Sequence, residues 1–235
     1  MIKRIKLFIF KLVRMLLKKR GYALDDFART SFSQMGEDRV LDVIFQDQKT
    51  GFYVDVGAFH PKLYSNTYLF YLKGWRGINI DAMPGSMQSF RKLRPRDINI
   101  EAPIAKTKKK LTYFMFDQPA INGFSQSLSE GRGKSSEFTL IAKKKLTTSS
   151  LKNILNENIP SDQEIDFMTV DVEGMDLEIL QSNDWEKYRP KVVIVEDLHF
   201  SLEKKDRSKI YTFLVRKQYM LIGKTDVSLI FKSKR

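Results

Sequence analysis

Residues 51–81 read GFYVDVGAFHPKLYSNTYLFYLKGWRGINID. The apolar run over 51–57 ends in a glycine turn and is typical of a short buried strand. Residues 65–73 have helical spacing and end at Gly74, and a second apolar strand follows at 77–81. A strand, a helix and a strand in this order predict a βαβ unit, in which the two strands lie parallel in one sheet.

The alternation of strands and helices continues along the rest of the chain. Further strands are expected at 99–104, 111–116, 165–170, 191–195 and, as a closing pair, within 219–231. Further helices are expected directly after Asp38 and at 84–93, 151–155, 176–181 and 210–217. Residues 117–137 are rich in Gly, Ser, Gln and Asn and are expected to form a mobile loop or flap. The pattern predicts an α/β fold with a mostly parallel, doubly wound sheet.

The composition excludes sites that depend on cysteine and argues against nucleic acid as a partner. The chain has 235 residues and no cysteine, which excludes disulfides, thiolate metal sites and cysteine nucleophiles. Its net charge is +13, but eight of the basic residues lie within residues 1–23, which hold no acid, and without them the excess is +5. The lysine clusters at 106–110 and 143–145 are typical of solvated loops or helix ends. Nucleic acid is therefore not the expected partner, and no spacing demands a metal ion.

Residues 1–23 are predicted to form a cationic amphipathic helix ahead of an α/β domain at 24–235. Read as a helix, residues 2–20 segregate basic side chains from an apolar face, the basic set being Lys3, Arg4, Lys11, Arg14 and Lys18. Such a helix can lie on an anionic membrane surface, pack on the domain or a second subunit, or be disordered. Basic residues interrupt the apolar run and no small-residue cleavage site follows, so neither a signal peptide nor a spanning segment is expected. The expected location is cytoplasmic, on the inner face of the membrane if the helix docks there.

Polar residues stand where the first two predicted strands end. Asp55 and Gly57 close the first strand, and Asp81 closes the second. Ligands of open α/β sheets bind beyond the carboxyl ends of the strands, where a glycine admits close backbone approach and an acid can accept hydrogen bonds from both ribose hydroxyls. Each acid taken alone is equally well explained as a loop or cap residue. Ala58 to Pro61 replace the later glycines of a dinucleotide fingerprint, which favours S-adenosylmethionine, a cofactor with a ribose but no phosphate.

A second concentration of carboxylates is the segment Asp171-Val-Glu173-Gly174, which follows the predicted buried strand at 165–170. These carboxylates are expected to face the same crevice as Gly57. Asp171 or Glu173 could bind the amino group of the cofactor, orient a substrate hydroxyl or accept its proton. The alternative is an ordinary cap at the N-terminus of the next helix. Glu196, at the end of the strand at 191–195, could contribute as well.

Several short stretches in a fixed order make the sequence similar to a known family. They are Ser33-Gln-Met-Gly-Glu-Asp38, Tyr53-Val-Asp-Val-Gly-Ala58, Ser65-Asn-Thr67, Gly74-Trp-Arg-Gly77 with Ile80-Asp-Ala-Met-Pro84, and Asp166 to Leu180. As an ordered set, spanning residues 33–197, they resemble the FkbM family of methyltransferases. The resemblance implies a Rossmann-like class I methyltransferase sheet with an antiparallel final strand, and S-adenosylmethionine as the cofactor.

The resemblance also implies which residues bind that cofactor. Asp55 and Gly57 match the cofactor loop, and Asp81 matches the ribose-binding acid, which is usually Glu in the family. Gln34, in the first of the matching stretches, and Asp171 are assigned to the cofactor as well.

Catalytic roles are implied for the carboxylates of the D-x-E-G motif. Asp171 and Glu173 match positions near the transferred methyl group. Two departures from the family pattern are His60-Pro61, where many members have Asn and Gly, and Ala82 in place of a common Pro. His60 thereby becomes a candidate acid/base group, with a structural role in the loop as the alternative.

The expected function is O-methylation of a sugar, a glycan or a related small-molecule hydroxyl. The family resemblance implies this acceptor class. The alternatives are an RNA methyltransferase, favoured by charge alone, and a non-catalytic, membrane-associated binding module on a methyltransferase fold. The sequence identifies neither the acceptor nor the oligomeric state.

Overall fold

The computed structural model describes residues 12–13, 15–16, 28–134, 137–160 and 162–235. The chain divides into two compact units, Met1–Ser31 and Phe32–Arg235. The predicted cationic helix over residues 2–20 lies outside the described residues, except for the four at 12–13 and 15–16, which are helical. In the part of the chain that is described, no helix has the length and apolar character needed to cross a membrane.

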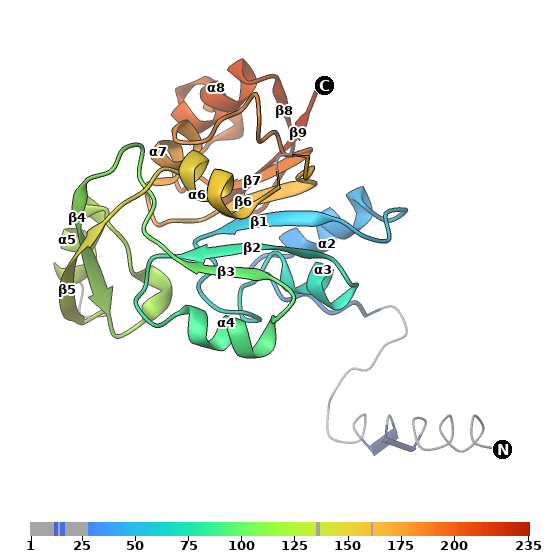
Figure 1. The fold of residues 1–235 in the computed structure, drawn as a ribbon, viewed down its shortest axis with the longest axis horizontal. Coiled ribbons are helices and arrows are strands. Elements are labelled where there is room, and N and C mark those ends of the chain that lie inside the picture. Colours follow the sequence, from blue (N-terminus) through green and yellow to red (C-terminus); the bar gives the residue numbers. More distant parts are fainter. Residues whose placement is uncertain (1–11, 14, 17–27, 135–136, 161) are drawn as a thin grey trace. The chain divides into compact units, whose positions relative to one another are not determined.

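The unit Phe32–Arg235 is built on one twisted sheet (Figure 1). Seven strands of its described residues pair in the order β3-β2-β1-β6-β7-β9-β8. Their bounds are β1 (Phe52–Val56), β2 (Arg76–Asp81), β3 (Ile98–Glu101), β6 (Phe167–Val170), β7 (Val192–Glu196), β8 (Tyr219–Lys224) and β9 (Ser228–Ser233). The first five are parallel, and β9 runs antiparallel between β7 and β8. The predicted α/β class and the antiparallel final strand are confirmed.

Helices cover both faces of the sheet because the buried strands are apolar on both sides. On one face lie α2 (Glu37–Ile44), α3 (Tyr68–Leu72) and α4 (Met87–Leu93). On the other lie α6 (Leu151–Asn158), α7 (Asp176–Gln181) and α8 (Lys209–Arg216). Within β1, Tyr53 points to the first face and Val54 and Val56 to the second. The strand order leaves the carboxyl ends of β1, β2, β6 and β7 along one edge.

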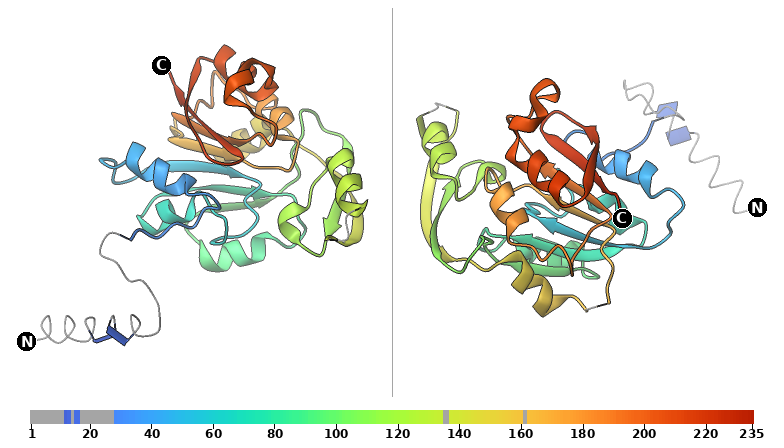
Figure 2. Two further views of the ribbon diagram at one scale, coloured as in Figure 1. Left: turned by 180° about the vertical axis from the view of Figure 1, so that it is seen from behind. Right: turned by 90° about the horizontal axis from the view of Figure 1, so that it is seen from above.

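A two-stranded insertion interrupts this pattern between β3 and α6. Its strands are β4 (Lys110–Phe116) and β5 (Leu140–Thr147), which pair antiparallel. Figure 2 shows the insertion standing at one end of the main sheet. Between the strands lie a 3-10 helix at Pro119–Ile121 and α5 (Gln126–Lys134). Within the mobile loop or flap expected over 117–137, residues 119–121 and 126–134 are thus helical and not loop. The assignment of lysines 143–145 to a loop or helix end is wrong, since they lie in β5.

Tertiary contacts explain why α5 forms despite the poor helix formers Gly131 and Gly133. The Arg132 guanidinium donates to the carbonyl of Ile121 at 2.8 Å and to the Glu173 carboxylate. These contacts tie the helix both to its own insertion and to the loop after β6. Local propensity alone would not select a helix here.

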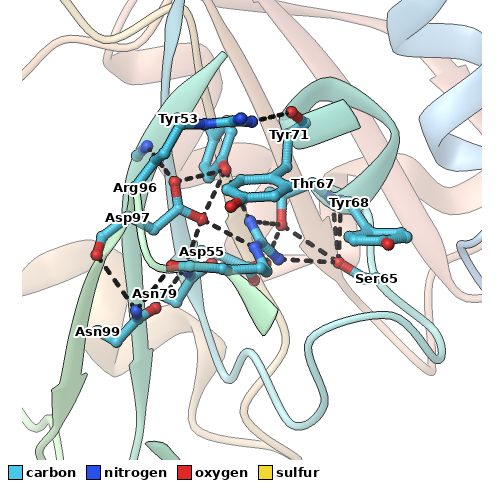
Figure 3. Close-up of polar contacts among 12 residues, drawn as sticks. Tyr53, Asp55, Ser65, Thr67, Tyr68, Tyr71, Asn79, Arg96, Asp97 and Asn99 are labelled. Carbon is cyan, nitrogen blue, oxygen red and sulfur yellow. Dashed lines mark hydrogen bonds and ion pairs between the residues drawn. The ribbon is translucent and has the colours of Figure 1, made fainter. Parts of the chain in front are cut away.

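A buried polar network holds the amino-terminal half of the sheet together (Figure 3). Arg94, at the end of α4, is fully buried and pairs with Asp97 at 2.8 Å. Its guanidinium also donates to the Tyr53 hydroxyl (2.8 Å) and the Thr67 hydroxyl (3.0 Å). Thr67 in turn donates to the Asp55 carboxylate at 2.6 Å. The network thus links α4 to β1 and to the chain that leads into α3.

Candidate active site

A pocket opens at the carboxyl ends of β1, β2 and β6, beneath the insertion. The strand-end residues that line it include Gly57, Asp81, Asp171 and Glu173. The insertion supplies Tyr113 and residues 119–120 and 122–124 from above, and Ala102 and Ile104 close the side beyond β3. This is the position at which ligands of open α/β sheets bind.

The loops after β1 and β6 meet at Gly57. Its backbone is left-handed, with φ of 82°, and a Cβ at this position would lie 1.7 Å from the carbonyl oxygen of Asp171. Only glycine allows this approach. The N–H groups of Gly57 and Ala58 both donate to the carbonyl of Ile80. These two N–H groups are therefore engaged within the protein, and the glycine allows the two loops to pack closely at the pocket wall.

Asp81 lies at the end of β2 with its carboxylate at the pocket wall. One oxygen accepts the N–H of Phe59 at 2.9 Å, and the other accepts the N–H of Met83 at 2.7 Å. Burial raises the pKa of Asp81, and these two hydrogen bonds act against that rise. Each carboxylate oxygen can accept more than one hydrogen bond, so the group is fixed in position and still able to accept ligand hydroxyls.

The segment Asp171–Gly174 forms a strained turn at the other side of the pocket. Glu173 has a left-handed backbone, with φ of 56°, which is uncommon for a residue other than glycine. Its side chain pairs with Arg132 of α5, and the two side chains are 17% and 18% exposed. Gly174 is also left-handed, and a Cβ there would lie 2.7 Å from Leu128 of α5. The turn therefore holds the insertion against the sheet.

Asp171 opens onto the pocket within a concentration of carboxylates. Asp171 is exposed to the pocket, and desolvation by the surrounding protein at the end of β6, together with the charges of Glu196 and Glu173, raises its pKa well above the usual value. Asp176, at the start of α7, accepts the N–H groups of Val172 and Gly174, both at 3.1 Å. Burial and the Asp171 charge raise the pKa of Asp176 to about 8. Such a site attracts a cation and can hold a proton near neutral pH.

Three residues assigned to the site by sequence do not line the pocket. Asp55 is buried behind it in the Arg94 network, and burial raises its pKa to about 6 while Arg94 opposes the rise. His60 accepts the N–H groups of Lys62 (3.1 Å) and Leu63 (2.9 Å) through Nδ1, which is the structural role in the loop. Gln34 is exposed. The structure brings together Gly57, Asp81, Asp171 and Glu173, and leaves these three outside.

The residues that sequence reasoning missed come from the insertion. Tyr113 is almost fully buried and packs against Phe124, with the ring centroids 4.8 Å apart. Asn122 accepts the N–H of Phe116 at 2.7 Å and reaches the Met83 sulfur at 3.5 Å. The alternating faces of β4 predict that Tyr113 points inward, but nothing local predicts that the insertion folds back over β2. Among the described residues, no group of His, Asp or Glu could hold a metal ion.

Comparison with known proteins identifies the family. A family model described as the methyltransferase FkbM domain matches residues 55–221, which carry the pocket described above. Among solved structures, the chain is similar to a protein from Sulfolobus solfataricus described as a type 11 methyltransferase, with 11% identity and a TM-score of 0.41. That similarity covers 87% of this chain and 95% of the other. No curated protein matches the chain. Because the family model covers well over half of its length and includes the pocket, the chain belongs to the FkbM family of methyltransferases.

Proposed function

We propose that the protein transfers the methyl group of S-adenosylmethionine to a hydroxyl of a sugar, a glycan or a related small molecule. The observation that carries the cofactor assignment is the position of Asp81 at the end of β2, fixed by two backbone N–H groups and facing the pocket. A carboxylate held in this way can accept both hydroxyls of a ribose.

The residues around Asp81 also fit the remaining parts of the cofactor. Ala102, Ile104 and Tyr113 form an apolar wall suited to a planar base. On the opposite side, Asp171 and Glu173 offer carboxylates to the ammonium group and to the sulfonium. The tight contact of Gly57 with Asp171 brings the two halves of the site to this spacing.

When bound, the cofactor supplies an electrophilic methyl group on a cationic sulfur. The protein's part is to align an acceptor oxygen with that methyl group and to take up the hydroxyl proton. Asp171 and Glu173 stabilise the positive charge before transfer, and one of the three carboxylates Asp171, Glu173 and Glu196 takes the proton. Desolvation at the end of β6 and the charges of Glu196 and Glu173 keep the pKa of Asp171 raised, which suits proton uptake.

Incubation with S-adenosylmethionine tritiated on its methyl group tests this function. Capsular or lipopolysaccharide glycans and total RNA, each from bacteria, are offered separately as acceptors. Label in the glycan fraction that survives mild base, as an ether does, supports O-methylation of sugars. Label in RNA alone, or none with either acceptor although the cofactor binds, contradicts the proposed acceptor class. A Glu173→Gln variant, which keeps the shape but removes the charge, is expected to lower turnover by about 10²-fold if Glu173 takes the proton, and near-normal turnover would assign the proton to Asp171 or Glu196.

A further inference from the structure

We propose that the methyl acceptor carries an anionic group, a phosphate or a carboxylate, in addition to the hydroxyl that is methylated. It lies in a groove beside the cofactor pocket, with its hydroxyl at Glu196 and its anionic group at Arg207 and Lys209. This inference rests on the proposed methyl transfer and specifies the substrate class of the same site.

The groove lies next to the cofactor pocket. Glu173 lines the pocket and the next residue, Gly174, lines the groove. One wall is the start of α5, including Leu128, and the other is formed by the chain after β7 and by residues 207–210. The groove has a volume of about 540 Å³, which is enough for a sugar with a substituent.

The inner end of the groove is acidic and contains an unused hydrogen-bond acceptor. Oε2 of Glu196 is buried and has no hydrogen-bond partner among the described residues. The adjacent Asp197 is engaged, because it accepts the Ser208 hydroxyl at 2.6 Å and the N–H of His199 at 3.3 Å. Glu196 is therefore the groove carboxylate that is left to accept a hydrogen bond from an acceptor hydroxyl.

Glu196 is also suited to take the hydroxyl proton. Burial and the charges of Glu173 and Asp176 raise the pKa of Glu196 to about 8, Arg132 opposes that rise, and Asp197 adds to it. At a pH near this value about half of the Glu196 carboxyl groups are ionised, and the ionised form accepts the proton of a hydroxyl and disfavours a second anion beside it.

The outer end of the groove has the opposite charge. Arg207 and Lys209 line it, and Arg216 lies with them along the adjoining surface, where Asp206 is the acidic residue. Neither Arg207 nor Lys209 forms an ion pair with another described residue. Ser208, between them, donates to Asp197 and accepts the N–H of Tyr211 at 2.9 Å. Ser208 thus holds the turn that carries Arg207 and Lys209 next to β7, the strand that ends in Glu196.

The groove is therefore acidic at its inner end and basic at its outer end, and a neutral sugar has no charged group for the basic end to bind. A phosphate or carboxylate can accept paired hydrogen bonds from Arg207 and is attracted by Lys209. The same group is repelled from the carboxylates at the inner end. An acceptor with one anionic group is therefore oriented with a hydroxyl toward the cofactor pocket, and the reverse orientation is disfavoured.

Isothermal titration calorimetry and amide NMR of the full chain, saturated with S-adenosylhomocysteine, test this proposal. The probes are glucose 1-phosphate, glucuronic acid, neutral methyl glucoside and inorganic phosphate. Glucose 1-phosphate is expected to bind at least tenfold more tightly than methyl glucoside and to shift the amide signals of residues 196–199 and 207–210. Tighter binding of glucuronic acid than of glucose 1-phosphate would identify the anionic group as a carboxylate. Inorganic phosphate is expected to shift only the signals of 207–210.

A double variant separates this groove from general charge attraction. Arg207→Gln with Lys209→Gln is expected to abolish the tenfold preference. The matched control, Lys232→Gln with Lys234→Gln, removes two exposed charges at the opposite end of β9 and is expected to keep it. Equal binding of charged and neutral sugars, or equal loss in both double variants, overturns the proposal. If S-adenosylhomocysteine itself does not bind, the proposed function fails; if it binds and the anionic preference is absent, only this inference fails.

Discussion

The carbonyl oxygen of Asp171 lies against the α-carbon of Gly57, so close that a Cβ at residue 57 would lie 1.7 Å from it. Gly57 follows β1 and Asp171 follows β6, two neighbouring parallel strands. This contact sets the spacing between the half of the site that holds Asp81 and the half that holds Glu173. It makes a glycine at position 57 a requirement of the site's geometry.

Gly57→Ala is expected to lower the free energy of unfolding by about 2 kcal/mol or more, because a left-handed alanine costs about 1–2 kcal/mol before any steric conflict. Chemical denaturation measures this, and calorimetry should show weaker cofactor binding. Gly131→Ala in α5 is the control, since nothing lies within 4 Å of a Cβ there. A Gly57→Ala protein as stable as wild type would show that the loops separate freely.

Arg94→Met is expected to destabilise the fold by about 3–5 kcal/mol, because it leaves the buried Asp97 carboxylate without its positive partner. Lys73→Met is the matched control. It breaks an ion pair with Asp42 in which Lys73 is 44% exposed, and should cost no more than about 1 kcal/mol. Urea denaturation measures the free energy of unfolding of both variants. Equal losses would show that the Arg94 network stabilises the fold no more than a surface ion pair does.

The preference for S-adenosylmethionine over S-adenosylhomocysteine is expected to increase from pH 6 to pH 9. Burial raises the pKa of Asp171 well above its usual value, and burial raises the pKa of Asp176 and of Glu196 to about 8. These groups are protonated at the lower pH and ionise as the pH rises. Ionisation adds attraction for the sulfonium, which the homocysteine product lacks.

The ratio of the two dissociation constants is measured by calorimetry at each pH. It should change by about fivefold or more, which corresponds to roughly 1 kcal/mol. Asp171→Asn should flatten the profile. A constant ratio, or one that falls with rising pH, would place the sulfonium away from these carboxylates.

The same raised pKa values determine how stability depends on pH. The folded state binds protons at Asp55, Asp176 and Glu196 that the unfolded chain releases at lower pH. Their contribution is therefore fully present below the ordinary carboxyl range and is lost as the pH rises through about 6 and then about 8. Binding of a cationic cofactor should offset the loss at the upper end.

The sheet and half of the site could be predicted from sequence because their determinants are local. An apolar run that ends in Asp81 or Asp171 specifies both a buried strand and the place of its last carboxylate. Asp55 has the same local pattern but is linked through the Thr67 hydroxyl to Arg94, 39 positions away in the sequence, and no spacing predicts this link. His60 was ambiguous, and its Nδ1 contacts with the following N–H groups are the structural alternative.

Of the insertion, the strand at 111–116 could be predicted from its alternating faces, but β5 and α5 could not, because they depend on tertiary contacts. β5 carries three consecutive lysines that interrupt its alternation of apolar and polar residues, and it pairs along its length with β4. α5 contains two glycines and is fixed by the contacts of Arg132 with Ile121 and Glu173. Both β5 and α5 are stabilised by tertiary contacts, which cannot be read from a single sequence.

Residues 1–20 are predicted to dock the enzyme on an anionic membrane surface. Each Lys or Arg near such a surface contributes about 1 kcal/mol, and the apolar face adds to this. The full chain should therefore sediment with phosphatidylserine vesicles at low salt and be released at high salt. Deletion of residues 1–23 should abolish sedimentation and leave the domain folded. A full chain that ignores such vesicles, with a deletion that destabilises the domain, would instead make the segment a packing element.

The most direct test of the account is calorimetric titration of S-adenosylmethionine into wild type and Asp81→Ala. Wild type is expected to bind, and the variant to bind about 10–100-fold more weakly, the loss of hydrogen bonds worth about 1.5–3 kcal/mol to a charged group. Asp47→Ala, which removes an exposed carboxylate, should bind as wild type does. No heat with the wild-type protein, or an unchanged affinity in a folded Asp81→Ala variant, would contradict the assignment of this pocket to the cofactor.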